Sequence, residues 1–205
     1  MDTRIKNVVF DFGGVLVDLD FKRCFHAFRA AGFSDIEDRF SAIKRDRIFD
    51  LYEKGEISTD KFRNELRKHL NSGLSDKDIS DMWNEMLGTI PSYKLNLLLK
   101  LKERYRVYLL SNTNELHWDY AREKLFRCRG HTVNDFFTKP YLSFEMHLEK
   151  PDAAIYKEML YDAQLKAEET FFIDDLDVNC RGAASVGMAT HRYRVGTDLT
   201  RLFDL

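Results

Sequence analysis

Acidic and polar side chains stand directly after three apolar runs of this chain, where each run gives way to a turn. They are Asp11 after residues 5–10, Ser111 and Asn112 after residues 106–110, and Asp174 and Asp175 after residues 170–173. A carboxylate at the end of a buried strand carries a desolvation cost, so we expect it to bind a metal ion or to act as a nucleophile. These side chains are therefore the first candidates for chemistry.

Lys150 adds a cation to this set. It precedes Pro151 and a helical pattern at residues 153–160, so its ammonium is expected near a helix N-terminus, where free amide groups also favour anions. Two or three carboxylates suit a hard cation such as Mg²⁺, while a lysine, a hydroxyl and an amide at a chain turn suit a phosphoryl group. The combination predicts a site for magnesium and a small-molecule phosphate ester.

The elements that must position these groups alternate between strand and helix. A weaker run at residues 188–191 predicts a further strand, and helical patterns at residues 94–103, 116–126 and 153–160 separate the runs. Strands joined through helices form right-handed crossovers, and hence a parallel sheet that is covered on both faces. In such a sheet ligands bind beyond the carboxyl ends of the strands. The pattern predicts an α/β fold with a doubly wound, Rossmann-like parallel sheet.

The stretch between the apolar runs at residues 5–10 and 106–110 has a different pattern, because it contains no convincing strand. Its apolar residues recur at helical spacing within residues 21–28, 36–43, 62–70 and 79–86. Ser75 and Asp78 resemble a capping pair that opens the last of these helices. We expect a helical cap over residues 19–89, inserted into a core of residues 1–18 and 90–205. A bundle of this size can bury its own apolar faces and move as a unit.

The composition of the chain limits the kinds of partner that it is expected to bind. The chain has 205 residues, of which 44% are hydrophobic, and its formal net charge is -2, with basic and acidic residues interleaved. No apolar run approaches the roughly 18 residues of a membrane span. The first residues lack a signal-peptide pattern, and the three cysteines are odd in number and lack metal or redox spacing. We expect a cytoplasmic protein with no nucleic-acid or membrane partner; the oligomeric state stays open.

Taken in order, the segments resemble the motifs of the haloacid dehalogenase-like (HAD) hydrolase superfamily over nearly the whole chain. The motifs are VVFDFGGVLVD (8–18), LLSNT (109–113), EKPDAAIY (149–156) and FFIDDLDVNCRGA (171–183), and YEKGEISTDKF (52–62) is similar to the cap of one branch. The resemblance implies that Asp11 is a nucleophile that forms an aspartyl-phosphate. It implies that the phosphoryl group is held by Ser111, Asn112 and Lys150, of which Ser111 and Lys150 also act in catalysis. It implies a magnesium ion held by Asp11, Asp174, Asp175 and the backbone carbonyl of Gly13.

One position departs from the pattern of the superfamily. Most of its phosphatases carry a second aspartate, a general acid and base, where this chain has Gly13. Loss of general acid catalysis typically lowers the rate by a factor of about 10²–10⁴. Electrostatic stabilisation of the transition state by a metal ion and a lysine usually contributes more to the rate. The leaving group could need no proton, the substrate or another side chain could supply one, or turnover could be slow. Some relatives with glycine here act on sugar 1-phosphates, and the resemblance favours a substrate of that kind.

The sequence thus predicts a magnesium-dependent phosphatase of a small phosphorylated metabolite. One alternative is a non-catalytic module that binds a phosphorylated ligand or a protein, to which Gly13 gives weight. Another is a metal-independent 2-haloacid dehalogenase, which the acidic pair Asp174 and Asp175 disfavours.

Several other polar residues lie near the motifs. Asp18 and Asp20 are expected in solvated turns at the exit to the cap, and His147 on a surface loop. His117 is expected to pack rather than to face the site. Asn179 follows the acidic pair and could orient the magnesium ligands or Lys150.

Overall fold

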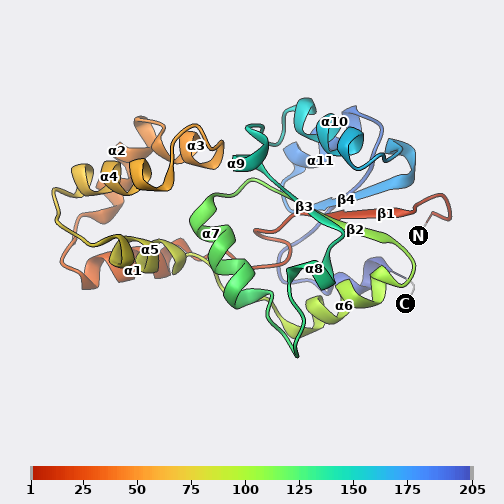
Figure 1. Cartoon of the computed structure of the whole chain (residues 1–205), viewed down its shortest axis with the longest axis horizontal. Helices are drawn as coiled ribbons and strands as arrows, with labels where there is room; N and C mark the ends of the chain where they lie inside the picture. Colours follow the sequence, from red (N-terminus) through yellow and green to blue (C-terminus); the bar gives the residue numbers. More distant parts are fainter. Residues whose placement is uncertain (1, 204–205) are drawn as a thin grey trace.

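The computed structural model describes residues 2–203, and within them it has one sheet of five parallel strands in the order β3-β2-β1-β4-β5 (Figure 1). The strands are β1 (Asn7–Phe10), β2 (Arg106–Ser111), β3 (Lys139–Leu142), β4 (Thr170–Asp174) and β5 (Ala189–Arg192). β1 lies at the centre and pairs with β2 on one side and with β4 on the other. Because these three strands run in the same direction, their polar carboxyl ends meet at one edge of the sheet.

Helices cover both faces of the sheet, as the alternating pattern predicts (Figure 1). On one face, the side chains of Val8 and Phe10 join an apolar cluster with α6 (Ser92–Lys102), α8 (Val133–Phe136) and the 3-10 turn Leu199–Leu202. On the other face, Val9 joins a second cluster with α10 (Ala153–Asp162) and α11 (Asp177–Ser185). Neighbouring residues of a strand point to opposite faces, and both faces are covered, so Val8, Val9 and Phe10 of β1 are all apolar. The doubly wound α/β fold is confirmed.

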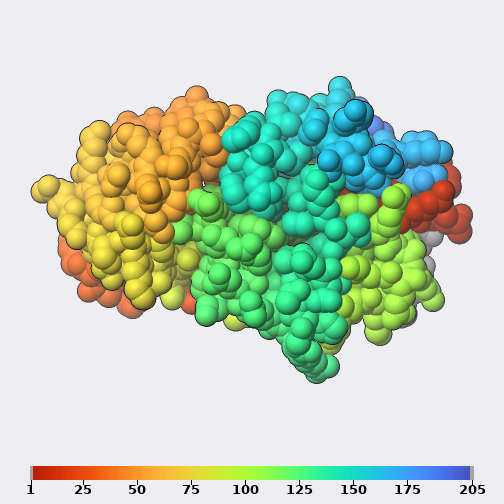
Figure 2. Space-filling model, viewed as in Figure 1, coloured from red at the N-terminus to blue at the C-terminus, as the bar shows by residue number. Residues whose placement is uncertain are grey.

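Of the six helices that lie between β1 and β2, the first five form a layer of their own beside the sheet (Figure 1). They are α1 (Phe21–Ala30), α2 (Ile36–Arg45), α3 (Ile48–Glu53), α4 (Thr59–Leu70) and α5 (Asp76–Asn84). Their apolar faces pack into a separate cluster that includes Phe40, Phe62 and Trp83. In the space-filling view this helical insertion, in orange and yellow, lies against green segments of the core (Figure 2).

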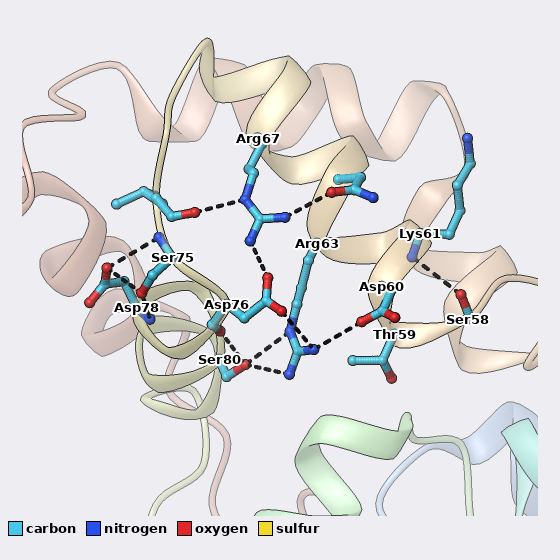
Figure 3. A network of polar contacts seen from close by, with 12 residues as sticks. Ser58, Thr59, Asp60, Lys61, Arg63, Arg67, Ser75, Asp76, Asp78 and Ser80 are labelled. Atoms are coloured by element: carbon cyan, nitrogen blue, oxygen red, sulfur yellow. Dashed lines mark hydrogen bonds and ion pairs between the residues drawn. The ribbon is translucent and has the colours of Figure 1, made fainter.

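Polar contacts fix the turn between α4 and α5 (Figure 3). The guanidinium of Arg67 donates to the carbonyl of Leu74 at 2.7 Å and also contacts Asp76. Arg63 donates to the hydroxyl of Ser80 at 3.0 Å, which joins the two helices directly. The predicted capping pair is present, because Ser75 and Asp78 form a reciprocal capping box at the start of α5.

Two short antiparallel segments connect the insertion to the core. Leu19 and Leu87 form a bridge, the amide of Asp20 donates to the carbonyl of Met86 at 2.8 Å, and the amide of Gly88 donates to the carbonyl of Asp18 at 2.9 Å. Asp18 is exposed, and the carboxylate of Asp20 caps α1. The paired segments lie close to the predicted domain limits at residues 18 and 90, which remain a prediction.

Two differences from the sequence expectation concern an edge strand and the helix that follows β2. The edge strand β3 was not expected, since it is four residues long and contains Pro140, which lacks the amide donor that an interior strand needs. The single helix expected over residues 116–126 is α7 (Glu115–Tyr120) followed by a π-helical turn, Ala121–Leu125, in which the amide of Phe126 bonds the carbonyl of Ala121.

A buried lysine supports the turn that follows β1. Lys94 of α6 is 3% exposed, and its ammonium donates to the carbonyl of Val15 at 2.6 Å and lies 5.5 Å from the ring centre of Tyr193. Burial lowers the pKa of Lys94. The helical pattern around this residue gave no sign of this role, because a lysine on a helix is usually solvated.

We expect Lys94→Met to lower the free energy of unfolding by about 1–3 kcal/mol, because it leaves the buried carbonyl of Val15 without its donor. Urea unfolding measures the change. Lys100→Met, on an exposed position of the same helix, is the matched control and should unfold like the wild type. Equal stability of Lys94→Met and the control would contradict this role.

Candidate active site

Three carboxylates converge at the carboxyl edge of the sheet. Asp11 follows β1, Asp174 ends β4, and Asp175 is next along the chain; one oxygen from each lies within 4.8 Å of the others. Asp11 and Asp174 are buried, and Asp175 is half-buried. The close approach depends on Gly14, whose φ is +76° and where a Cβ would lie 2.5 Å from the carboxylate of Asp175.

Lys150 lies among these carboxylates, although it is distant from them in sequence. Its Nζ is 2.7 Å from Oδ1 of Asp11 and 2.7 Å from Oδ2 of Asp174. Its side chain is buried, and the pKa of Lys150 is raised, since the two carboxylates outweigh the burial that would lower it. Lys150 is therefore an ammonium that joins the ends of β1 and β4.

Two asparagines hold this arrangement in place. The side-chain amide of Asn112 donates to the carbonyl of Lys150 at 2.9 Å and accepts from its backbone amide at 2.9 Å. Asn179 donates from Nδ2 to Oδ1 and Oδ2 of Asp174 at 3.0 and 3.1 Å. Asn179 thus orients one of the predicted magnesium ligands. The predicted contact of Asn112 with substrate remains a prediction, because its side chain is engaged with Lys150.

The charges of the site are unbalanced. The carboxylates of Asp11, Asp174 and Asp175 face one buried ammonium, with Arg192 acting on Asp175 from the exposed side, so negative charge is in excess at this point. Burial raises the pKa of Asp11 to about 7, with Lys150 opposing the shift and Asp174 adding to it. Burial also raises the pKa of Asp175, and the charge of Asp174 adds to this. Carboxylate oxygens in this number and charge fit a divalent hard cation such as Mg²⁺.

Ser111 and Gly13 border the same point. Ser111 is buried at the end of β2, and among residues 2–203 its hydroxyl makes one long bond, of 3.3 Å, to the carbonyl of Asn112. At Gly13, an added Cβ would lie 2.9 Å from Cδ1 of Leu19. Leu19 therefore occupies the space that a side chain at position 13 would enter.

A cavity of about 470 Å³ opens between this edge of the sheet and the helical insertion. The core contributes Gly13, Asn112 and Thr113 to its wall, and the insertion contributes aromatic rings such as Phe40 and Phe49. Leu19 and Phe21, 45% and 53% exposed, also line it and supply exposed apolar surface there. A phosphate ester bound at the carboxylates would place the rest of the molecule in this cavity.

Contacts around the hydroxyl of Ser143 join the insertion to the core. Ser143 donates to the carbonyl of Glu53 at 2.6 Å and accepts from the amide of Thr113 at 2.9 Å. Lys54 forms an ion pair with Glu149 at 2.9 Å, and the ring of His147 donates from Nδ1 to the carbonyl of Lys54. His147 thus faces the insertion and not the carboxylates.

His117 lies at the same boundary and is committed to packing, as expected. Its ring stacks on Trp83 with centroids 4.9 Å apart, and Nε2 bonds the carbonyl of Trp83 while Nδ1 bonds the side chain of Asn114. Burial lowers the pKa of His117 to about 4, so the ring is neutral.

Sequence reasoning missed Glu53 and Ser143 as parts of the site. Glu53 stands in YEKGEISTDKF, a segment that resembles a family cap, and that resemblance was the available signal. Nothing in the sequence indicated that Ser143 lies near the site, because it is the edge strand β3 that brings it beside Thr113.

Comparison with known proteins agrees with this geometry. The model of the haloacid dehalogenase-like hydrolases matches residues 5–187. The D-ribitol-5-phosphate phosphatase of Bacteroides thetaiotaomicron is 34% identical over 194 residues, which cover 95% of this chain and 94% of the relative. The chain therefore belongs to the haloacid dehalogenase-like hydrolases.

Two solved structures share the whole fold. A HAD family enzyme from Bacteroides thetaiotaomicron, solved with magnesium and inorganic phosphate, is 45% identical, has a TM-score of 0.93, and is matched over 97% of this chain and 99% of its own. A HAD-like hydrolase from Porphyromonas gingivalis is 35% identical, with a TM-score of 0.87 and 98% of both chains covered. The protein is thus a phosphatase-like hydrolase, and magnesium is the cofactor that its solved relatives support. Among the described helices, none is long and apolar enough to cross a bilayer.

We expect Asn179→Ala to weaken magnesium binding by about 10–100-fold, because Asp174 loses the Nδ2 donor that contacts both of its oxygens, although the Leu176 amide and Lys150 still donate to it. Titration calorimetry with MgCl₂ measures the affinity. Asn96→Ala, at an exposed position of α6, is the control. An affinity equal to that of the control would show that Asn179 does not support the metal ligands.

Proposed function

We propose that this protein is a magnesium-dependent phosphatase of a small phosphorylated metabolite and that it acts through an aspartyl-phosphate on Asp11. The observation that carries the proposal is the convergence of Asp11, Asp174 and Asp175 around the ammonium of Lys150. A nucleophile, a cation and a set of hard oxygen ligands at one point are the parts that phosphoryl transfer requires.

The reaction proceeds in two displacements at phosphorus. A carboxylate oxygen of Asp11 attacks, the bond from phosphorus to the leaving oxygen breaks, and the phosphoryl group is left on Asp11. Water then attacks the aspartyl-phosphate, the bond to Asp11 breaks, and inorganic phosphate leaves with the carboxylate restored. Asp11 is held for attack by the amide of Phe12, which donates to Oδ1 at 2.7 Å, and by Lys150.

Lys150 and Ser111 bind the phosphoryl oxygens in this scheme. The Lys150 ammonium offsets the negative charge of both the nucleophile and the phosphoryl group, and its burial strengthens the interaction. The Ser111 hydroxyl has one long bond at 3.3 Å and is available to donate to an oxygen of the ester. The magnesium ion, when bound by Asp11, Asp174, Asp175 and the Gly13 carbonyl, supplies further charge neutralisation.

A sugar or polyol phosphate is the proposed substrate class. The relative named D-ribitol-5-phosphate phosphatase matches nearly the whole chain and supports this choice. The cavity of about 470 Å³ is large enough for a small metabolite, and it offers both polar groups such as Ser41 and Lys44 and apolar rings.

Non-catalytic binding of a phosphorylated ligand is the second candidate, because Gly13 lacks the usual acid. A metal-independent dehalogenase is disfavoured, since the acidic pair Asp174 and Asp175 points toward a cation.

Asp11→Asn is expected to abolish turnover of p-nitrophenyl phosphate in the presence of magnesium, because the amide is a far weaker nucleophile than the carboxylate. Release of p-nitrophenol measures the rate. Asp38→Asn, exposed on α2, should retain wild-type activity, and chelation of magnesium by EDTA should inactivate the wild type. If wild type and Asp11→Asn are equally inert, the phosphatase proposal is wrong and non-catalytic binding gains support.

Among alkyl phosphates, we expect a higher kcat/KM for pentitol and sugar phosphates than for nucleoside monophosphates, because the relative that supports the proposed class is named for a pentitol phosphate. A phosphate-release screen with magnesium tests this, with Asp11→Asn as the blank. Preference for nucleoside monophosphates would contradict the proposed substrate class.

A further inference from the structure

The missing acid at Gly13 leaves a chemical requirement, a proton for the leaving oxygen, that another group of the cavity or the substrate itself must meet. An alkyl phosphate has a poor leaving group, so breaking its bond to phosphorus is slow unless a proton reaches the leaving oxygen. Leu19 occupies the space beside Gly13, so the segment after β1 offers an apolar surface there. The proton must come from another wall of the cavity or from the substrate.

We propose that Glu53, at the C-terminal end of α3, is the general acid and base of this enzyme. This inference rests on the proposed phosphatase function and deepens it. Glu53 would donate its proton to the leaving oxygen as that oxygen departs from phosphorus. The resulting carboxylate would then take a proton from the water that attacks the aspartyl-phosphate, which restores the acid for the next cycle.

The backbone of Glu53 is fixed beside the loop that holds the predicted phosphoryl-binding residues. Its carbonyl and the amide of Thr113 bond the same hydroxyl, that of Ser143, at 2.6 and 2.9 Å. Thr113 directly follows Asn112, and both line the cavity with Glu53. At Gly55, where φ is +65°, a Cβ would lie 2.1 Å from the carbonyl oxygen of Phe144, so this turn packs tightly on the core.

Within the described residues, Glu53 is the cavity carboxylate that no other side chain neutralises. The carboxylates that line the cavity are those of Glu37, Asp50 and Glu53. Glu37 is exposed and paired with Arg29, and Asp50 is exposed and paired with Arg47. Glu53 is half-buried, and in the described part of the chain its carboxylate has neither an ion pair nor a hydrogen bond. His117, the cavity histidine, has both ring nitrogens bonded.

The surroundings of Glu53 suit a group that must hold a proton near neutral pH. Burial raises the pKa of Glu53 to about 7, and the negative charges of Asp50 and Glu149 add to the shift. Other charged or titratable groups of the neighbouring elements are Glu37 and Lys44 on α2, Lys54 beside it, and His117 and His147 of the core. The charge of Glu149 is partly offset by Lys54 at 2.9 Å. A general acid is most effective when its pKa lies near the working pH.

Two substrates distinguish a proton donor from a merely structural residue. The p-nitrophenolate leaving group needs no proton, whereas the alkoxide of D-ribitol 5-phosphate or glycerol 3-phosphate does. With magnesium present, Glu53→Gln should lower the single-turnover rate of leaving-group release from the alkyl phosphate by about 10²–10⁴-fold. The burst of p-nitrophenol should stay within a few-fold of the wild type. Glu56→Gln, exposed in the same turn, is the matched control and should behave as the wild type with both substrates.

The pH profile provides a second readout. The acid acts in its protonated form, so the single-turnover rate with the alkyl phosphate should fall as pH rises through about 7 in the wild type. Asp50→Asn removes a negative charge that raises this pKa, so the alkaline limb should move to lower pH. In Glu53→Gln the limb should be absent.

The outcomes separate this inference from the proposal on which it rests. Suppose that the wild type is active and that Glu53→Gln loses activity on both substrates equally, or on neither. This result would overturn the role of Glu53 but not the phosphatase proposal. A wild type inert toward both substrates with magnesium would overturn the phosphatase proposal itself, and the role of Glu53 with it. Selective loss of the alkyl phosphate would support the assignment.

Discussion

The ammonium of Lys150 between Asp11 and Asp174 is the interaction on which the rest of the structure depends. It joins the first strand of the sheet to the fourth through two contacts of 2.7 Å, across most of the length of the chain. Two buried carboxylates this close together would repel each other strongly without a cation, and removing one partner of a buried ion pair typically costs about 3–5 kcal/mol. The strand order and the bonds from Asn112 and Asn179 serve to bring these three charges together.

The same charges explain why the site suits a divalent cation and a phosphate ester. One ammonium does not balance three carboxylates, and the residual charge is that which Mg²⁺ would neutralise. The helical insertion completes the site from the other side, because the turn after α3 is bonded to Ser143 and Glu149 of the core. The stack of His117 on Trp83 and the packing of Leu116 in the insertion's apolar cluster join the two parts as well.

Much of this could be predicted from the sequence, and the exceptions have physical reasons. Strands β1, β2 and β4 could be predicted because each is an apolar run followed by a polar turn, and their shared edge follows from parallel topology. The edge strand β3 could not, because it is short and contains Pro140. Ser143 could not either, since a serine after a strand is ordinary in sequence and only tertiary packing brings it beside Thr113 and Glu53. For Glu53 the resemblance of its segment to a family cap was a signal, but only tertiary packing places it at the cavity.

The most direct test of the account is to trap the covalent intermediate. Wild-type protein is mixed with magnesium and p-nitrophenyl phosphate, quenched in acid within milliseconds and reduced with borohydride, which converts an aspartyl-phosphate to homoserine. Peptide mass spectrometry then locates the modified residue. The account predicts homoserine at position 11 and at no other aspartate, with none formed when magnesium is chelated. Active protein that yields no modification at position 11, or yields it at another carboxylate, would contradict the central claim.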